Sequence, residues 1–183
     1  STARYSTAIT VTMFSAADYA FMSHALRLAE RGLYSTTPNP RVGCVVVRDG
    51  RIAGSGWHEK AGQPHAEINA LTASGAAARG ATAYVTLEPC SHHSRTPPCA
   101  DALIAAGIAR VVMAMEDPNP LVSGRGRALL QQAGVIVQMG LLQAEAQALN
   151  AGFVSRMTQK KPWVRLKTAA SLDGKTALNN GVS

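Results

Sequence analysis

Long hydrophobic runs are missing from this sequence, and cysteine and aromatic residues are scarce. No stretch approaches the roughly 18 uninterrupted apolar residues of a membrane-spanning helix. Three cysteines in 183 residues are too few for a disulfide framework. The glycine and proline contents, 16 and 9 residues, are ordinary, which excludes collagen-like and disordered classes. Because 46% of the residues are hydrophobic, the chain can bury a sizeable core, and we expect a soluble, cytoplasmic protein.

Acidic residues are also in short supply. Eleven Asp and Glu stand against 18 Lys and Arg, which gives a formal net charge of +7. Such an excess is compatible with a nucleic acid, with a phosphorylated small molecule, or with a solvated surface that has no partner. The basic residues are spread along the chain rather than clustered in blocks, so the charge does not choose between these partners.

Hydrophobic periodicity predicts an α/β fold. Ser15 and Asp18 form a capping-box-like start, and the apolar spacing behind them predicts a helix over 16–32. Asp49-Gly50 is a two-residue hairpin turn. The other predicted elements are strands 42–47 and 51–57, helix 65–74, strand 83–87, helix 98–106, strand 110–115, helix 126–133, strand 135–138 and helix 143–157. This alternation implies parallel neighbours and helices on both faces of a mixed, five-stranded sheet.

Both ends of the chain differ from this core in composition. Residues 1–12 are rich in Ser and Thr, and we expect a non-native or disordered leader there, with the native chain starting at Met13. Near the other end, residues 159–162 have the polar, proline-terminated composition of a linker, and residues 163–167 are strand-like. We therefore expect one domain at 13–159, and a linker with the truncated start of a second domain at 160–183.

His65, Glu67, Cys90 and Cys99 give the clearest chemical signal. One imidazole and two thiolates, with water as the fourth ligand, form a tetrahedral zinc set with an open catalytic position. Glu67 follows His65 by two residues, too close to add a ligand easily, but well placed to take a proton from that water. This combination is the signature of zinc-dependent deaminases, in which the glutamate is the general acid/base.

Prolines place two of these residues at expected helix starts. Pro64 precedes His65, and Pro97-Pro98 precedes Cys99. The positive end of a helix dipole favours thiolate over thiol and therefore favours metal binding. The alternatives are a buried histidine with two buried cysteines, or a closed structural zinc site. A structural site would have no use for Glu67.

Two further residues of similar chemistry receive ordinary interpretations. Cys44 lies inside an apolar strand and is interpreted as a core residue. His58 follows Gly56-Trp57 and is interpreted as a loop or packing residue rather than a ligand.

Four stretches of the sequence resemble one known family. They are Asn39-Pro40-Arg41-Val42-Gly43, Gly62-Gln63-Pro64-His65-Ala66-Glu67, the run from Leu87-Glu88-Pro89-Cys90 to Cys99, and Asp117-Pro118-Asn119-Pro120 with Gly124 and Gly126. They resemble the deaminase half of the bacterial bifunctional riboflavin-biosynthesis deaminase/reductase, and the similarity covers residues 14–183. Eight residues separate Cys90 from Cys99, whereas the two cysteines of cytidine and tRNA deaminases resemble a Cys-x-x-Cys pattern, with two residues between them.

The resemblance implies a cytidine-deaminase-like, three-layer α/β/α sandwich with one zinc ion per chain. It implies hydrolytic deamination of 2,5-diamino-6-ribosylamino-4(3H)-pyrimidinone 5′-phosphate to 5-amino-6-ribosylaminouracil 5′-phosphate and ammonia. Position by position, it assigns the following roles: His65, Cys90 and Cys99 as zinc ligands, Glu67 as the catalytic acid/base, Asn39 and His92 as base-contacting residues, and Arg95 as the residue that meets the substrate phosphate. Members of the family commonly associate, which leaves a homo-oligomer open.

The C-terminal segment resembles the opening of the family's reductase domain, which is similar to dihydrofolate reductase and uses NADPH. By position, Ala169 would border that cofactor and Ser183 would border the reductase substrate. About two dozen residues cannot build a reductase, so we expect no reductase activity from this chain, and NADPH only in a complete reductase domain.

The charge of +7 supports a second function, a base deaminase that acts on tRNA or single-stranded nucleic acid. Such an enzyme needs aromatic stacking platforms, and only 5% of the residues here are aromatic. A third function is a non-catalytic zinc module. The sequence favours the first function, with a small phosphorylated pyrimidine as partner and with neither nucleic acid nor membrane.

Overall fold

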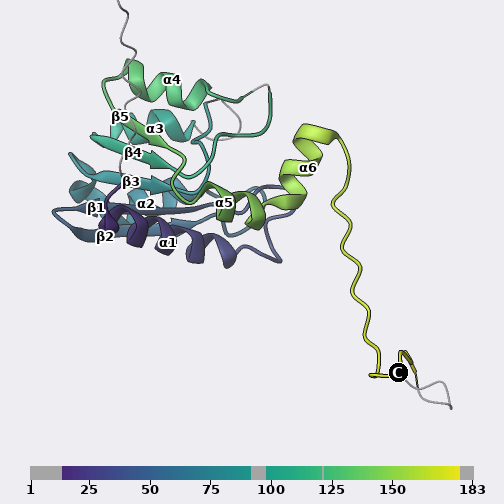
Figure 1. Cartoon of the computed structure of the whole chain (residues 1–183). Coiled ribbons are helices and arrows are strands. Elements are labelled where there is room, and N and C mark those ends of the chain that lie inside the picture. Colours follow the sequence, from purple (N-terminus) through teal and green to yellow (C-terminus); the bar gives the residue numbers. More distant parts are fainter. Residues whose placement is uncertain (1–13, 92–97, 121, 178–183) are drawn as a thin grey trace, which may run out of the picture.

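The computed structural model describes residues 14–91, 98–120 and 122–177 (Figure 1). The elements in chain order are α1 (Ala16–Glu30), β1 (Gly43–Arg48), β2 (Arg51–Trp57), α2 (Ala66–Ser74), the 3-10 helix η1 (Gly75–Ala78), β3 (Thr82–Val85), α3 (Cys99–Ala105), β4 (Arg110–Met113), α4 (Arg125–Gln132), β5 (Ile136–Met139), α5 (Gln143–Leu149) and α6 (Ala151–Gln159). Within these described ranges, none of the helices combines the length and apolar character that crossing a membrane requires.

The five strands form one mixed sheet in the order β2-β1-β3-β4-β5. The pairs β2–β1 and β1–β3 are antiparallel, whereas β3–β4 and β4–β5 are parallel. Asp49 and Gly50 join β1 to β2 with φ angles of 50° and 74°, which are the positive angles that a tight two-residue hairpin turn requires. The predicted mixed, five-stranded sheet and its hairpin are confirmed.

Helices cover both faces of the sheet, which makes the molecule a three-layer α/β/α sandwich (Figure 1). One face carries α1 and α5, and the other carries α2, α3 and α4. Gly43 lets α1 approach β1 closely, because a Cβ atom there would lie 1.9 Å from the carbonyl oxygen of Ala25. Cys44, the next residue, is fully buried in the core between the layers, as predicted.

A partly buried polar network fixes the start of α1 to the sheet. The Ser15 amide donates to the Asp18 carboxylate over 2.8 Å, and the Asp18 amide donates to the Ser15 hydroxyl over 3.2 Å, which confirms the capping box. The same carboxylate accepts hydrogen bonds from Tyr84 in β3, at 2.7 Å, and from Arg110 in β4, at 2.8 Å. Arg110 also donates to Gln138 in β5 over 2.7 Å, so one network spans three strands.

The C-terminal part departs from the sequence prediction in two places. The single helix expected over 143–157 is wrong, because Asn150 divides it into α5 and α6. The buried Asn150 side chain accepts a hydrogen bond from the Arg41 amide (2.8 Å) and donates one to the Arg41 carbonyl (2.9 Å), and this pairing replaces a continuous helix. The prediction that residues 163–167 are strand-like is also wrong. This segment is extended and exposed, and no strand pairs with it within the described residues.

Candidate active site and metal centre

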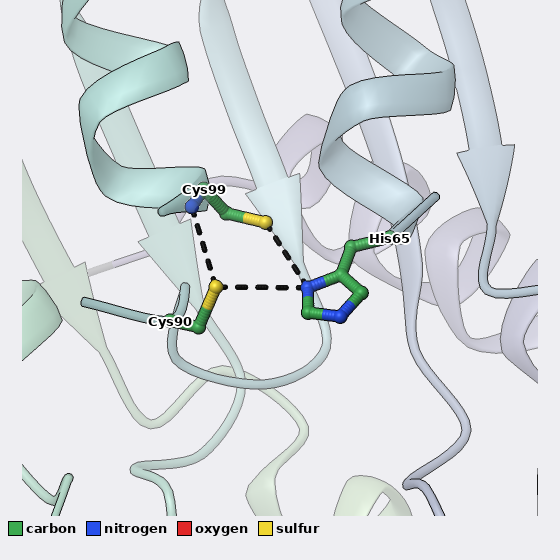
Figure 2. A group of neighbouring side chains, drawn as sticks. All are labelled: His65, Cys90 and Cys99. Carbon is green, nitrogen blue, oxygen red and sulfur yellow. Dashed lines mark hydrogen bonds between the residues drawn. The ribbon is translucent and has the colours of Figure 1, made fainter. Parts of the chain in front are cut away.

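The candidate metal ligands come together from three segments that are far apart in the sequence (Figure 2). His65 directly precedes α2, Cys99 is the first residue of α3, and Cys90 lies in the segment after β3. The Nδ1 atom of His65 lies 3.3 Å from Cys99 Sγ and 3.6 Å from Cys90 Sγ. Among the described residues, these three form the group whose ligand atoms all lie within 4.8 Å of one another. Two of the three side chains, His65 and Cys99, therefore lie at helix N-termini that the sequence predicts, after Pro64 and at Pro98.

The donor set and its spacing fit a zinc ion. Zn–N bonds of about 2.05 Å and Zn–S bonds of about 2.3 Å, at tetrahedral angles, separate a nitrogen from a sulfur ligand by about 3.6 Å. The nitrogen–sulfur separations of 3.3 and 3.6 Å are close to this value. Three protein ligands leave one position for water or substrate, as in catalytic zinc sites.

The two cysteines titrate as a coupled pair in which Cys90 ionises first. The hydrogen bond from Cys99, helped by the one from His65, overcomes burial and lowers the pKa of Cys90 to about 4. The same hydrogen bond, together with burial, raises the pKa of Cys99 above its usual range. The Cys99 amide also donates to Cys90 Sγ over 3.3 Å. A divalent cation among these atoms would displace the remaining thiol proton, so metal binding here is coupled to proton release.

Glu67 supplies a carboxyl group in the first turn of α2, where it is only 3% exposed. Burial and the nearby Cys90 sulfur raise the pKa of Glu67 to about 7. A carboxyl group that titrates near neutral pH can both accept and release a proton during a reaction. A shift of this size, caused mainly by burial, is typical of functional sites.

Asn39 and His58 form a second wall of the site. The Nδ1–H of His58 donates to the Pro64 carbonyl (3.1 Å), so the neutral Nε2 accepts a hydrogen bond from the Asn39 amide nitrogen (3.1 Å). Burial lowers the pKa of His58, which favours the neutral ring over the charged one. The β1–β2 hairpin brings the two residues together, because the His58 amide donates to the Val42 carbonyl just before β1. His58 therefore fixes the orientation of the Asn39 amide.

All these side chains except Cys99 border one cavity of about 340 Å³, a size suited to a small molecule. Its polar lining consists of Asn39, His58, His65, Glu67, Glu88, Cys90, Asp117 and Asn119, and its apolar lining of Pro40, Val42, Leu87, Val122 and Phe153. The cavity thus combines a proton-transfer group, a metal-ligand set and apolar walls that can hold a ring.

Several predicted site residues lie elsewhere or are not described. Asn39 borders the cavity, and its role as a base-contacting residue stays a prediction. His92, Arg95 and Ser183 lie outside the described residues, so their roles stay predictions. Ala169 lies in the exposed segment that follows α6, and the described lining of the cavity does not include it.

The sequence interpretation gives no role to several residues that border the cavity. His58, expected as a loop or packing residue, lies in a loop, is buried there and is bonded to Asn39. Its position offers a signal, because a hairpin places the residue after its second strand beside the residues before its first strand. Glu88, Asp117 and Asn119 stand out in the sequence only as parts of motifs. Sequence spacing cannot show that these motifs meet.

Comparison with known proteins identifies the family. Residues 15–115 match the family described as the cytidine and deoxycytidylate deaminase zinc-binding region. The chain is 60% identical over 166 residues to the riboflavin biosynthesis protein RibD of Escherichia coli (strain K12). This match covers 91% of this chain and 45% of that protein. The chain is 49% identical over 145 residues to the diaminohydroxyphosphoribosylamino-pyrimidine deaminase of Buchnera aphidicola subsp. Schizaphis graminum (strain Sg), which covers 79% of this chain and 99% of that protein.

A solved structure agrees with these sequence matches. Acinetobacter baumannii RibD, form 1, has a TM-score of 0.84 at 56% identity, covering 88% of this chain and 45% of that chain. The match confirms the cytidine-deaminase-like fold. The chain spans about half the length of the RibD relatives that it matches. It belongs to the cytidine and deoxycytidylate deaminase zinc-binding family, and its relatives include riboflavin biosynthesis proteins and a diaminohydroxyphosphoribosylamino-pyrimidine deaminase.

Proposed function

We propose that this chain deaminates 2,5-diamino-6-ribosylamino-4(3H)-pyrimidinone 5′-phosphate to 5-amino-6-ribosylaminouracil 5′-phosphate and ammonia, with one zinc ion held by His65, Cys90 and Cys99. The observation that carries the proposal is the buried Glu67, with its pKa near 7, in the same cavity as this ligand set. Neither a structural zinc site nor a packed histidine requires such a carboxyl group.

Glu67 is the residue that moves protons. When bound, zinc would act as a Lewis acid that activates a water molecule for attack on the ring carbon bearing the amino group. Glu67 accepts a proton from that water and delivers it to a ring nitrogen. It then takes the proton of the newly added hydroxyl group and passes it to the departing amino group, which leaves as ammonia. Asn39, oriented by His58, holds the base during these transfers.

The choice of substrate rests on the family branch. The Buchnera relative, named a diaminohydroxyphosphoribosylamino-pyrimidine deaminase, is matched over 99% of its length. The excess of basic residues is compatible with a phosphorylated substrate. His92 would contact the base and Arg95 the phosphate, by their positions in the family motif.

The proposal extends to the organisation of the chain. Residues 13–159 would form the deaminase domain, and residues 160–183 a linker and the start of a reductase domain. In a complete reductase domain, Ala169 would border NADPH and Ser183 the reductase substrate. The deaminase would work without nucleic acid or a membrane, and a homo-oligomer is compatible with it.

The test is mass spectrometry of the diaminopyrimidinone ribotide after incubation with zinc-loaded protein. Deamination replaces NH₂ by OH and raises the substrate mass by about one unit, with release of ammonia. Glu67→Gln should keep its zinc but lose turnover by on the order of a hundred- to ten-thousand-fold, because it removes the acid/base.

Glu30→Gln is the matched control, because Glu30 is an exposed carboxylate at the end of α1, outside the cavity. Its turnover should equal that of the wild type. An unchanged substrate mass with zinc-loaded wild-type protein would refute the proposed substrate, and full activity of Glu67→Gln would refute the role of Glu67.

A further inference from the structure

Glu88 is a buried carboxylate to which the mechanism above gives no role. It is 4% exposed, and it borders the cavity. Its Oε2 atom accepts hydrogen bonds from the amides of Asp117 (3.2 Å) and Gly124 (3.0 Å). Its Oε1 atom accepts one from the amide of Arg127 (3.0 Å). Three backbone N–H groups from one distant segment therefore converge on this side chain.

This carboxylate caps α4 from outside the helix. The residue before α4 is Gly124, which has no side chain to accept hydrogen bonds from the first amides of the helix. Glu88 is 39 residues away from Arg127 in the sequence, yet it accepts the amides at this helix start. A negative charge is favourable there, because the helix dipole is positive at its N-terminus.

The segment that Glu88 holds is a wall of the cavity. Asp117, Asn119 and Val122 from this segment all border the cavity. A second contact joins the same segment to the ligand-bearing chain, because a Cβ atom at Gly126 would lie 2.0 Å from the carbonyl oxygen of Pro89. The start of α4 is therefore packed directly against the residue that precedes Cys90.

We propose that Glu88 is a positioning residue, which holds the wall formed by Asp117, Asn119 and Val122 at a fixed distance from the metal-ligand set and thereby sets the affinity for substrate. It acts through that wall, because both of its oxygens accept hydrogen bonds from backbone amides of the segment that forms the wall. The inference rests on the proposed function, since the affinity in question is that for the proposed substrate.

The test is Glu88→Gln in the full chain. Glutamine keeps the shape of the side chain, but one acceptor oxygen becomes an NH₂ donor that faces backbone N–H groups. We expect one zinc per chain, exchange of the Asp117, Gly124 and Arg127 amides at least about tenfold faster, and KM raised about tenfold with kcat within about threefold of the wild type. Amide exchange is measured by NMR and zinc by mass spectrometry of the metal. Glu88→Asp, which keeps both oxygens, should show smaller changes and serves if Glu88→Gln does not fold.

Glu145→Gln is the control, because Glu145 is an exposed carboxylate in α5 that does not border the cavity. Its KM should equal that of the wild type. If Glu88→Gln has fast amide exchange but a normal KM, Glu88 is only a helix cap and the inference is overturned. A variant that loses only bound zinc, or only kcat, would also overturn it. If the wild type itself does not turn over the substrate, the proposed function fails, and the amide exchange of Glu88→Gln alone decides whether Glu88 holds the wall.

Discussion

At the scale of single residues, burial alone does not distinguish a metal ligand from a core residue. Cys44 and Cys99 are 0% and 1% exposed, respectively. Burial raises the pKa of the Cys44 thiol, which lies inside β1 and is absent from the metal-ligand group of the described residues. Cys99 instead faces His65 Nδ1. The neighbours of a thiol, not its depth, decide its chemistry.

This contrast gives a prediction for zinc content. Cys99→Ala should bind less than one zinc per chain, because two protein ligands hold zinc much more weakly than three. Cys44→Ala should keep one zinc per chain and lose only about 1 kcal/mol of unfolding free energy, since it removes one buried sulfur atom from the core. Metal analysis after dialysis against a weak chelator measures both. Full zinc occupancy in Cys99→Ala would contradict the ligand assignment.

At the scale of elements, Asp18 connects a helix start to the middle of the sheet. Burial opposes its ionisation, but hydrogen bonds from Arg110, Ser15 and Tyr84 hold the pKa of Asp18 well below its usual range. A carboxyl group whose pKa is lower in the folded than in the unfolded state stabilises the fold above its unfolded pKa, about 3.9. That stabilisation is lost as the pH falls through the folded pKa.

Asp18→Asn should therefore lower the unfolding free energy by about 2 kcal/mol at pH 7, because it leaves the Arg110 charge without its carboxylate. The gap between wild type and variant should narrow progressively below about pH 4, where the wild-type carboxylate begins to lose its advantage. Urea unfolding at a series of pH values measures this difference in unfolding free energy between wild type and variant. Asp49→Asn, at an ion pair whose Asp side chain is 85% exposed, should change stability by less than about 0.5 kcal/mol. A gap that stays constant toward acid pH would contradict the role of Asp18.

The elements also show where sequence periodicity reaches its limit. The hairpin and the helix starts at His65 and Cys99 follow from local chemistry, namely a turn dipeptide and prolines, so they are predictable. The division of the last helix is not predictable from the sequence. Asn150 ends α5 and is hydrogen-bonded to Arg41, which is 109 residues away. The helical periodicity on both sides of Asn150 does not indicate this long-range contact.

At the scale of the whole molecule, the sequence predicts the metal-ligand set better than it predicts the cavity. The four residues His65, Glu67, Cys90 and Cys99 have a spacing that only a few chemistries use. The cavity walls depend on tertiary contacts, such as that between Glu88 and Arg127, which leave no spacing rule in the sequence. The structure therefore adds the walls around the predicted ligands.

The exposed segment after α6 gives a prediction for the whole chain. Residues 160–177 are exposed and leave the packed layers (Figure 1). Among the described residues, limited digestion with trypsin should cleave first after Arg165, Lys167 and Lys175, because proteases act on exposed, irregular backbone. Arg110, which lies in β4 and is hydrogen-bonded to Asp18, is the internal control and should stay intact throughout. A time course by mass spectrometry in which the strands are cleaved as early as this segment would contradict the prediction.

The bond between Asn150 and Arg41 also constrains the order in which a working protein can be made. Asn39 of the cavity wall lies two residues before Arg41, whose backbone is bonded on both sides to Asn150. A nascent chain that has not yet reached Asn150 already contains every metal ligand and Glu67, yet its Asn39 segment lacks this clamp. During synthesis, the residues of the candidate metal-ligand group therefore emerge before the segment that contains Asn39 can gain its hydrogen bonds to Asn150.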